Sequence, residues 1–547
     1  MKRDAALVFV TICAATCIGL GSYCLLDVDE PRFATASRTM LEGGDLIVPH
    51  FNGAERFDKP ILVYWLQALA MWAFGTTELA ARLPSAICVS LASALVAAIA
   101  SMLGLARQAS IIAGLALGTC AQVQIMGHAA TADALLLACT TLVAYAQFAR
   151  ARGRLGFSTW AMLWLGLAAA LLSKGPPALV PVLSLWLGLR FCSGTRSDWR
   201  STALGIATCA GVVALWAVPA YVRSEGRFLS VGLGKHVLER SLRPFEGHGG
   251  FEPWWYLFYF ISVPLTFLPW SAFFADIVRI LRRPAQRSAG AIEGFPARAL
   301  LVWIGGTVLV FTIVTSKLPH YPLPAFPALA LGFAALWGTE LRYPRLAAVA
   351  LALTGAVVAF VMLFFVLRFD LGFASLAAIA LGATALFGFG AAALLVVRRN
   401  LSAATRVIVV TSFFVWILLA GGVRRGISEG ALHIEKLRHA PTLLFEDRPL
   451  LVYRLVMPSI AWYLRREYEQ LEGDDSKHAI QGLLERRARV LLREARLADL
   501  ERAIAASTLS PDERGRLAAM IHAPLWRQRG VLAQKGKLED LLVLGAP

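Results

Sequence analysis

The sequence predicts a polytopic α-helical membrane protein, and three observations lead to this expectation. Of the 547 residues, 57% are hydrophobic and only 16% are charged, whereas a soluble globular protein carries about 25% charged residues. The mean hydropathy is +0.62. Apolar runs of about 20 residues, the length that crosses a bilayer, recur from the N-terminus to about residue 422. These features exclude an ordinary soluble protein.

The distribution of charge predicts the orientation of the chain. The net charge is +17, but many basic residues lie in short tracts between apolar runs. This is the pattern of cytoplasmic loops rather than of a nucleic-acid-binding surface. Lys2 and Arg3 place the N-terminus inside. The tracts that we expect on the same side are 150–154, 196–200, 282–287, 342–345 and 398–399.

The apolar runs predict thirteen spans, and an odd number places the C-terminal tail outside. The first run lacks a convincing signal-peptidase motif and is followed at once by charged residues, so we expect an uncleaved span. The predicted spans lie at about 5–26, 82–104, 109–127, 131–149, 157–172, 176–192, 201–222, 254–280, 298–314, 322–338, 346–367, 373–397 and 405–422.

Three loops fall on the outer side in this topology. Loop 27–81 contains two segments with the character of interfacial helices, at about 31–42 and 60–74. The second outer loop is 223–252, and a third follows the ninth span at about 316–321.

Composition changes sharply after Arg424. We expect a transmembrane domain over residues 1–423 and a soluble domain over residues 424–547. Alternating strand-like and helix-like stretches predict that the second is a small α/β domain; they lie at 450–455, 458–469, 488–493 and 496–506.

Charged residues cluster directly after the first span. Asp29 and Glu30 precede Pro31, so a helix N-terminus explains them as well as chemistry does. The density of charge beside an apolar surface favours the functional interpretation, because charge at a membrane edge is costly. Arg32 lies about one helical turn beyond Asp29 and can face the same site.

Other charged residues lie at the outer ends of the predicted spans. Lys59, next to Asp58, either extends to lipid headgroups or pairs with the phosphate of a lipid substrate. Asp133 either caps the fourth span or takes part in chemistry. Lys174 lies in a short outer turn, where it can meet an anionic lipid. A structural and a functional interpretation both stay open for Lys59 and Asp133.

The second and third outer loops add cations. His236, Arg240 and Arg243 have helical spacing, so they can share one face, and clustered cations favour a phosphate or pyrophosphate. A solvated loop explains the same residues equally well. Lys317 and Tyr321 belong to the third loop, where Lys317 adds a cation at the outer edge.

This mixture of charges predicts an enzyme that acts on an anionic lipid phosphate. A carboxylate takes the proton of an attacking hydroxyl or orients it, while cations stabilise a departing phosphate. The candidate carboxylates are Asp29, Glu30, Asp58 and Asp133, and the candidate cations are Arg32, Lys59, Lys174, Arg240, Arg243 and Lys317.

An ordered set of short motifs over about residues 1–460 resembles the aminoarabinose (4-amino-4-deoxy-L-arabinose) transferases. These are GT-C glycosyltransferases related to protein O-mannosyltransferases. The motifs are Asp29-Glu30-Pro31-Arg32-Phe33, the run from Asp58-Lys59-Pro60 to Tyr64-Trp65, Thr131-x-Asp133, Ser173-Lys174-Gly175, and Lys317-Leu318-Pro319-x-Tyr321-x-Leu323-Pro324.

The resemblance implies a thirteen-span GT-C fold, a periplasmic C-terminal domain and an undecaprenyl-phosphate-linked sugar as donor. Asp29 then corresponds to the leading catalytic carboxylate and Asp133 to a second one. Lys59 corresponds to a ligand of the donor phosphate, together with Arg240 or Arg243; the resemblance does not choose between the two.

The resemblance also admits a divalent metal ion between Asp58 and His236, and no other cofactor. The family often has Glu where Asp58 stands, so the charge is kept but the reach is shorter. Members of the family differ in acceptor, so lipid A, another lipid and a protein all stay open.

We therefore expect a glycosyltransferase of the bacterial inner membrane with its active site facing the periplasm. One rival is a protein O-glycosyltransferase of the same superfamily. The other is a transporter or flippase for lipid-linked sugars. A flippase does not need carboxylate chemistry at Asp29 and keeps charges deep within its spans, whereas here they lie at the outer ends.

Overall fold

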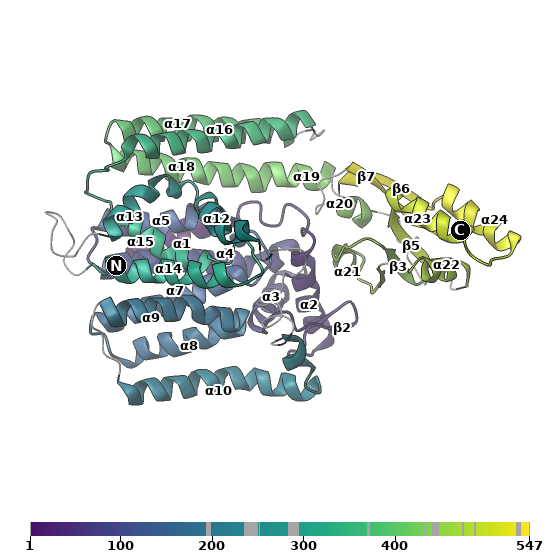
Figure 1. Ribbon diagram of the computed structural model, residues 1–547, viewed down its shortest axis with the longest axis horizontal. Coiled ribbons are helices and arrows are strands. Elements are labelled where there is room, and N and C mark those ends of the chain that lie inside the picture. Colours follow the sequence, from purple (N-terminus) through teal and green to yellow (C-terminus); the bar gives the residue numbers. More distant parts are fainter. Residues whose placement is uncertain are drawn as a thin grey trace.

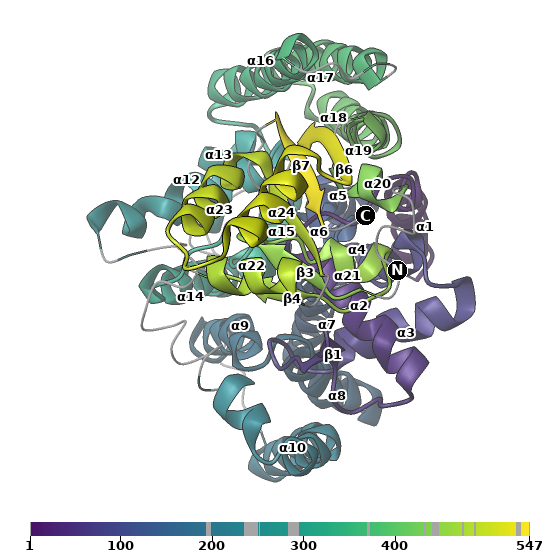
Figure 2. The same cartoon turned by 90° about the vertical axis from the view of Figure 1, so that its right-hand side faces the viewer.

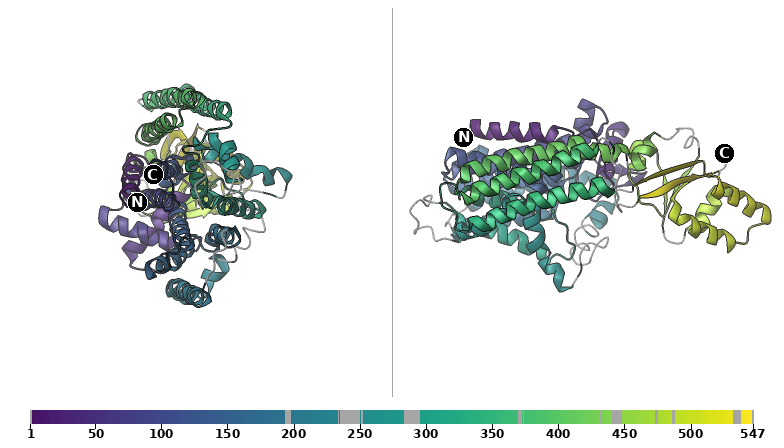
Figure 3. Two further views of the ribbon diagram at one scale, coloured as in Figure 1. Left: turned by 90° about the vertical axis from the view of Figure 1, so that its left-hand side faces the viewer. Right: turned by 90° about the horizontal axis from the view of Figure 1, so that it is seen from above.

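A computed structural model describes most of the chain (Figure 1). The described residues are 2–192, 198–232, 234, 250, 252–282, 295–368, 372, 374–430, 433–439, 448–472, 475–485, 488–531 and 538–545. Long helices lie side by side in one bundle, and a mixed sheet with short helices lies at one end of it (Figures 1 and 3).

Seven helices in the described part are long and apolar enough to cross a membrane. Six of them are α4 (Glu78–Met102), α7 (Asp133–Ala151), α8 (Phe157–Lys174), α10 (Trp199–Arg223), α16 (Pro344–Arg368) and α17 (Ala374–Val397). The seventh, Leu401–Glu429, combines α18 (Leu401–Leu418), the π-helical η6 (Leu419–Val423) and most of α19 (Arg424–Gly430).

Two further candidate spans are bent, which raises the number to nine in the described residues. One consists of α5 (Arg107–Thr119) and α6 (Ala121–Gly127), which meet at 63°. The other bends by 109° between η3–α12 and η4–α13. These four elements are η3 (Pro253–Leu257), α12 (Phe258–Thr266), η4 (Trp270–Phe273) and α13 (Phe274–Leu281).

The two bends satisfy each other's backbone. The N–H of Ala121 donates to the carbonyl of Leu268 at 2.9 Å, and the indole N–H of Trp270 donates to the hydroxyl of Thr119 at 3.0 Å. Broken helices are tolerated at membrane depth only where freed polar groups find such partners. Hydrogen bonds between the two bent spans therefore stabilise both helix breaks.

Helices occur at all thirteen predicted positions, but several are short. They are α1 (Lys2–Cys17), η1 (Pro176–Ala178) with α9 (Leu179–Cys192), α14 (Ala297–Ile313), and η5 (Leu323–Ala325) with α15 (Phe326–Ala334). Helix α1 ends well before the predicted boundary near residue 26. Gly19 follows with φ +75°, and a β-carbon there would lie 2.8 Å from the backbone of Ala420. The chain leaves the helix where it packs closely against η6.

The first outer loop contains both helices expected there. They are α2 (Asp29–Gly43) and α3 (Leu62–Phe74), joined through a short hairpin of β1 (His50–Phe51) and β2 (Ala54–Glu55). Helix α2 ends at Gly44, whose φ of +74° is a left-handed conformation that glycine adopts without strain. Both helices lie at the end of the bundle that carries the sheet (Figure 1).

The C-terminal sheet has five strands in the order β4-β3-β5-β7-β6. Strand β3 runs parallel to β4 and β5, while β7 is antiparallel to β5 and β6. The strands are β3 (Leu450–Tyr453), β4 (Glu469–Leu471), β5 (Arg489–Arg493), β6 (Trp526–Val531) and β7 (Leu538–Leu544).

Alternating residues of this sheet face two different cores. Leu451 and Val490 pack against helices on one face. These helices are α22 (Ser476–Leu484), α23 (Leu497–Ala505), which follows η8 (Glu494–Arg496), and α24 (Pro511–His522). Val452 and Leu491 belong to the other core, which also contains Cys24 from the linker after α1. Helices α20 (His433–Arg438) and α21 (Ser459–Tyr463) cover this second face.

Helix α21 connects the sheet to α2. The guanidinium of Arg38 donates to the carbonyls of Trp462 at 2.7 Å and Ala461 at 2.9 Å. Asn52 exchanges two hydrogen bonds with the backbone of Tyr468. Figure 2 shows the sheet and its helices in front of the bundle, with α21 beside α2.

Candidate functional site

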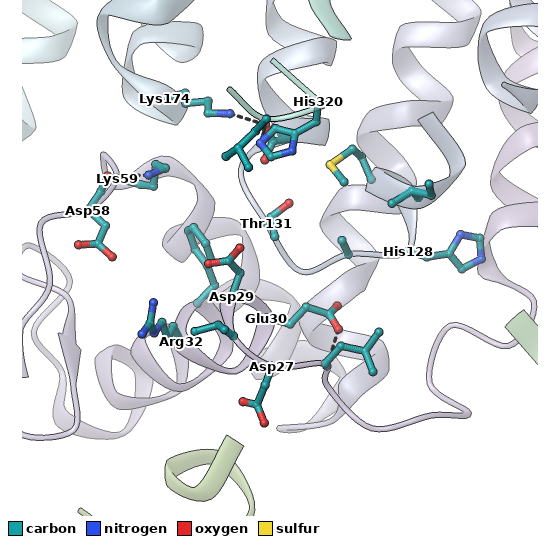
Figure 4. A pocket seen from close by; sticks show the side chains of 18 of the residues that line it. Asp27, Asp29, Glu30, Arg32, Asp58, Lys59, His128, Thr131, Lys174 and His320 are labelled. Carbon is teal, nitrogen blue, oxygen red and sulfur yellow. Dashed lines mark hydrogen bonds and ion pairs between the residues drawn. The ribbon is translucent and has the colours of Figure 1, made fainter. Parts of the chain in front are cut away.

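A cavity of about 320 Å³ lies where α2, α7, α8 and the segment before η5 meet. Its polar side chains come from stretches that are far apart in the sequence (Figure 4). The predicted site residues that line it are Asp29, Glu30, Arg32, Asp58, Lys59, Asp133, Lys174 and Tyr321.

Asp29 is the first residue of α2 and lies in the middle of this group in Figure 4. It is exposed, and its carboxylate forms no hydrogen bond or ion pair with any residue that the structure describes. It therefore does not cap its own helix. The positive end of the helix dipole favours a negative charge at this position. The carboxylate is thus accessible and available to a substrate.

The carboxylate of Glu30 is occupied by a buried ion pair. Its Oε1 accepts from Arg82 Nε and Ala130 N–H, and its Oε2 accepts from Arg82 Nη2 and Leu26 N–H, all at 2.8 Å. Arg82 is fully buried, and its remaining N–H groups donate to the carbonyls of Leu20, Tyr23 and Cys24. These partners hold the pKa of Glu30 below its usual range despite its burial.

Glu30, a candidate for catalysis from the sequence, is therefore not among the groups available to a substrate. In Figure 4 its side chain points away from Lys59 and Lys174. Instead it joins the segment that carries Asp29 to Ala130, in the loop before Asp133. The sequence gives no signal for Arg82 as its partner, because an arginine inside a long apolar helix looks the same whether its partner is a lipid headgroup or a carboxylate.

Asp133 begins α7 and is held by two basic side chains. Lys174, the last residue of α8, donates to its Oδ1, and His320 Nε2 lies 3.7 Å from the same oxygen. Burial lowers the pKa of His320 to about 4, although Asp133 opposes the shift. The imidazole is therefore neutral at neutral pH, and Lys174 supplies the charge that compensates Asp133. Lys174 also lies 5.2 Å from the Tyr321 ring.

Three further cations of the cavity lie on the side of Asp58. Arg56 Nη2 lies 2.7 Å from Asp58 Oδ2, and Lys59 Nζ donates to the Asp58 carbonyl at 2.9 Å. Arg32, one turn after Asp29, lines the same side (Figure 4). This side of the cavity is therefore cationic and suits a phosphate, because charge-assisted hydrogen bonds to phosphate oxygens are strong.

Asp58 was also a candidate metal ligand together with His236. His236 lies outside the described residues, as do Arg240 and Arg243. Within the part of the chain that the structure describes, no group of three or more potential metal ligands occurs. Asp58 is already paired with Arg56 there.

Lys317 is not part of the cavity lining. It is 3% exposed, and its Nζ donates to the carbonyls of Thr312 at 2.8 Å and of Val314. It therefore satisfies the backbone at the end of α14. Its neighbour in the same motif, His320, lines the cavity instead.

Four basic residues of the cavity were not candidates from the sequence, namely Arg56, His128, His320 and Arg424. His320 lies inside one of the motifs that resemble the family, and Arg56 lies two residues before another, so proximity to those motifs was the available signal. Arg424 marked only a change of composition. Nothing in the local sequence connects it to the first outer loop.

Asp27 also lines the cavity, and its carboxylate supports the loop before Asp29. Its side chain points away from Asp29 in Figure 4 and accepts hydrogen bonds from the backbone N–H of Ser459 at 2.8 Å and from its hydroxyl at 2.5 Å. Burial raises the pKa of Asp27 to about 6, although Ser459 opposes the shift. The C-terminal part thus contacts the loop two residues before Asp29.

The geometry combines an available carboxylate, a second carboxylate compensated by lysine, and a group of cations. This is the set needed to activate a nucleophile and to stabilise an anionic leaving group.

The known proteins that this chain resembles are named as glycosyl transferases, which agrees with this set of residues. A family model described as dolichyl-phosphate-mannose-protein mannosyltransferase matches residues 58–221. The undecaprenyl phosphate-alpha-4-amino-4-deoxy-L-arabinose arabinosyl transferase of Erwinia tasmaniensis is 28% identical over 307 residues, which cover 55% of this chain and 54% of that protein. The chain thus spans about half the length of the curated relatives it matches.

Solved structures extend the likeness to nearly the whole chain. The crystal structure of ArnT from Cupriavidus metallidurans bound to undecaprenyl phosphate has a TM-score of 0.75 and 19% identity, and the match covers 99% of each chain. The apo oligosaccharyltransferase of Archaeoglobus fulgidus has a TM-score of 0.52 and 11% identity, covering 94% of this chain and 72% of that one. These likenesses show a GT-C fold, and the relatives confirm the resemblance to aminoarabinose transferases.

Proposed function

We propose that this chain is a glycosyltransferase that moves a sugar from a polyprenyl-phosphate donor to an envelope lipid. The observation that carries the proposal is the cavity that contains Asp29, Lys59 and Lys174. The Asp29 carboxylate has no hydrogen bond or ion pair with any described residue, and it lies beside the two lysines in Figure 4. The names of the relatives support undecaprenyl phosphate as the carrier and 4-amino-4-deoxy-L-arabinose as the sugar. Lipid A is the acceptor that we infer from the resemblance to the aminoarabinose transferases.

We infer a location in the bacterial inner membrane, with the cavity facing the periplasm. Residues 1–423 form thirteen spans, including the short and bent helices, and residues 424–547 form a periplasmic α/β domain. Contacts at or within three residues of the basic tracts 282–287, 342–345 and 398–399 support this topology. Arg279 donates to the Glu340 carbonyl, and Arg399 lies 3.4 Å from the Glu340 carboxylate, so these tracts meet on one side. Positive residues accumulate on the cytoplasmic side.

The proposed reaction is a displacement at the anomeric carbon of the sugar. The bond between this carbon and the oxygen of the polyprenyl phosphate breaks, and a bond to an acceptor oxygen forms. The bonding electrons leave with the phosphate, whose charge Lys59, Lys174 and Arg32 stabilise. Asp29 orients the acceptor oxygen and takes its proton when that oxygen is a hydroxyl. Asp133 acts through Lys174, whose ammonium it holds at the cavity wall.

A lipid tail has an apolar surface available beside this cavity. A second cavity of about 410 Å³ has a nearly completely apolar lining from α3, α4 and α7. Helix α7 contributes to both, with Asp133 in the polar cavity and Leu135 in the apolar one. This arrangement suits an amphiphilic substrate whose charged group meets the polar cavity while its chain stays in lipid.

The test uses purified full-length protein in lipid nanodiscs with undecaprenyl-phosphate-linked 4-amino-4-deoxy-L-arabinose and a lipid A acceptor. Release of undecaprenyl phosphate and the mass of the acceptor are measured. We expect Asp29→Asn to lower turnover by at least about 100-fold, because a positioned general base contributes about 10²- to 10⁴-fold. Glu42→Gln is the matched control, since Glu42 lies in the last turn of the same helix with its side chain 51% exposed.

Turnover by Asp29→Asn within a few-fold of the control would sink the assignment. A parallel assay offers a serine- and threonine-rich peptide in place of lipid A, because the matching family model describes protein mannosyltransferases. Transfer to the peptide but not to lipid A would show that the acceptor is another protein rather than a lipid.

A further inference from the structure

Asp29, the carboxylate that we assign to catalysis, has no partner that holds its own side chain. It forms no side-chain hydrogen bond or ion pair with any described residue, so its direction follows from the backbone at the start of α2. A catalytic group has to lie within about 0.5 Å of its productive position. The groups that hold the residues next to Asp29 therefore decide where its carboxylate meets a substrate.

The segment before Asp29 is held by side chains of the C-terminal part. The backbone N–H of Cys24 donates to the Ser428 hydroxyl at 3.0 Å, and that of Leu25 donates to the Tyr463 hydroxyl at 2.8 Å. Both N–H groups belong to buried residues that lie in neither a helix nor a strand. Because buried N–H groups need a partner, this segment depends on residues that follow it by more than 400 positions.

Ser459, the first residue of α21, makes the contact nearest to Asp29. Its backbone N–H donates to Asp27 Oδ1 at 2.8 Å, and its hydroxyl donates to Asp27 Oδ2 at 2.5 Å. Ser459 is fully buried, so water does not compete for its hydroxyl. Since both oxygens of the Asp27 carboxylate are bound, this carboxylate cannot rotate or shift without breaking a hydrogen bond. The contact thus fixes the chain two residues before Asp29.

Helix α21 holds the chain at a second point beyond Asp29. Arg38, about two and a half turns along α2, donates to the carbonyls of Trp462 and Ala461. Its guanidinium carbon also lies 5.1 Å from the centre of the Trp462 ring, and the Arg38 side chain is buried. One helix of five residues therefore binds the chain on both sides of Asp29. A shift of α21 would move the backbone that carries the carboxylate.

The helix bundle holds the other neighbour of Asp29. Glu30 is bound to Arg82 of α4, whereas Asp27 is bound to α21. In Figure 4 the side chains of Asp27, Asp29 and Glu30 leave this stretch in three different directions. Asp29 therefore lies between one residue that is fixed by the bundle and one that is fixed by the C-terminal part.

We propose that Ser459 is a positioning residue for catalysis, which acts through Asp27 and sets the direction in which Asp29 meets the acceptor. The inference rests on the proposed function and gives the C-terminal part a role in the chemical step, although Ser459 itself does not line the cavity. Loss of the Ser459 hydroxyl leaves its N–H bond to Asp27 in place. The expected loss of rate is therefore about 10-fold, below the ~10²-fold that a misplacement of about 1 Å causes.

The experiment measures turnover by full-length Ser459→Ala in lipid nanodiscs. We expect kcat to fall about 10-fold while the KM for donor stays within about two-fold of wild type, because the cations of the cavity are untouched. Ser510→Ala is the matched control, since the Ser510 hydroxyl caps α24 in the same part of the chain. Helix α24 lies at the end farthest from the bundle in Figure 1. An equal loss of kcat in the control would overturn the proposal.

A second comparison separates positioning from a general loss of structure. In an Asp29→Asn background, Ser459→Ala should cause no further loss, because its effect acts through the Asp29 carboxylate. Asp27→Asn keeps an acceptor for the Ser459 N–H and adds a donor that its hydroxyl accepts, whereas Asp27→Ala keeps neither. We expect kcat to fall in Asp27→Ala and to be largely retained in Asp27→Asn. Equal fold losses from Ser459→Ala in both backgrounds, or from both Asp27 variants, would contradict a positioning role.

A measurement without substrate separates this proposal from the proposed function. Hydrogen–deuterium exchange at the amides of residues 24–26 is followed by mass spectrometry in nanodiscs, for wild type, Ser459→Ala and Ser510→Ala. We expect exchange about 10-fold faster in Ser459→Ala, as for the loss of one hydrogen bond to a charged group, and no change in Ser510→Ala. Faster exchange in a protein that transfers no sugar would support the contact and count against the proposed function alone. Unchanged exchange in Ser459→Ala would overturn the positioning role, whatever the turnover.

Discussion

The ion pair between Glu30 and Arg82 leads to a prediction about stability. Each oxygen of the Glu30 carboxylate accepts two hydrogen bonds, and all five N–H donors of Arg82 are used. In Glu30→Gln, the amide nitrogen replaces one oxygen and faces two N–H donors. Two hydrogen bonds are lost, and Arg82 becomes a buried charge without a counterion. We expect the free energy of unfolding to fall by about 3–5 kcal/mol.

The pairing makes the two substitutions strongly coupled. Arg82→Gln leaves the Glu30 carboxylate buried without a counterion, so it is expected to cost about the same amount. The double variant removes both charges together, and we expect its loss to be smaller than the sum of the single losses by about 2–3 kcal/mol. Backbone groups that the pair now satisfies keep the double variant less stable than wild type.

The assay is equilibrium unfolding in mixed micelles, followed by the fluorescence of the protein's 15 tryptophans, for wild type, both single variants and the double variant. Arg107→Gln is the control, because the side chain of Arg107 in the Arg107–Asp4 pair is 74% exposed. Solvent screens such an exposed pair, so it contributes little to stability. A coupling energy below about 0.5 kcal/mol would refute the reasoning. So would a single loss no larger than that of the control.

Three further predictions concern other charged residues of the protein. Burial raises the pKa of Asp27 from 3.8 to about 6, so the folded state retains a proton that the unfolded state has lost. Stability should therefore fall by up to about 3 kcal/mol as the pH rises from 4 to 6, and Asp27→Asn should remove this dependence in unfolding measured across that range. Lys174→Met should raise the donor KM and lower kcat at least about 10-fold in the turnover assay, because it removes a charge beside the leaving phosphate and leaves Asp133 uncompensated. Lys317→Met should cost about 1–3 kcal/mol of stability by leaving two partly buried carbonyls without their donor, with an unchanged donor KM.

Each of these has an outcome that contradicts it. A stability profile that keeps its slope in Asp27→Asn would assign the dependence to another group. An unchanged donor KM in Lys174→Met would remove Lys174 from the phosphate site. A raised donor KM in Lys317→Met, with stability retained, would return Lys317 to that site.

The arrangement of helices and the carboxylates of the cavity were predictable from local sequence, whereas their partners were not. Apolar runs located the helices, since length and hydropathy are properties of a segment by itself. The bend between α5 and α6 was not foreseen, because the groups that stabilise it come from residues 268 and 270. In the same way, Asp29 and Glu30 are adjacent and equally acidic in sequence. Arg82, far along the chain, makes one of them structural and leaves the other available.

The contacts before Asp29 also determine when in the life of the chain this loop becomes ordered. The N–H of Cys24 donates to Ser428, that of Leu25 to Tyr463, and Asp27 accepts from Ser459. These partners lie more than 400 positions later in the sequence. Because chains fold from the N-terminus as they are synthesised, the ribosome delivers Asp29 long before it delivers the residues that hold its backbone. The membrane part can be inserted while this loop still lacks its partners, and the loop is among the last segments to reach its final conformation.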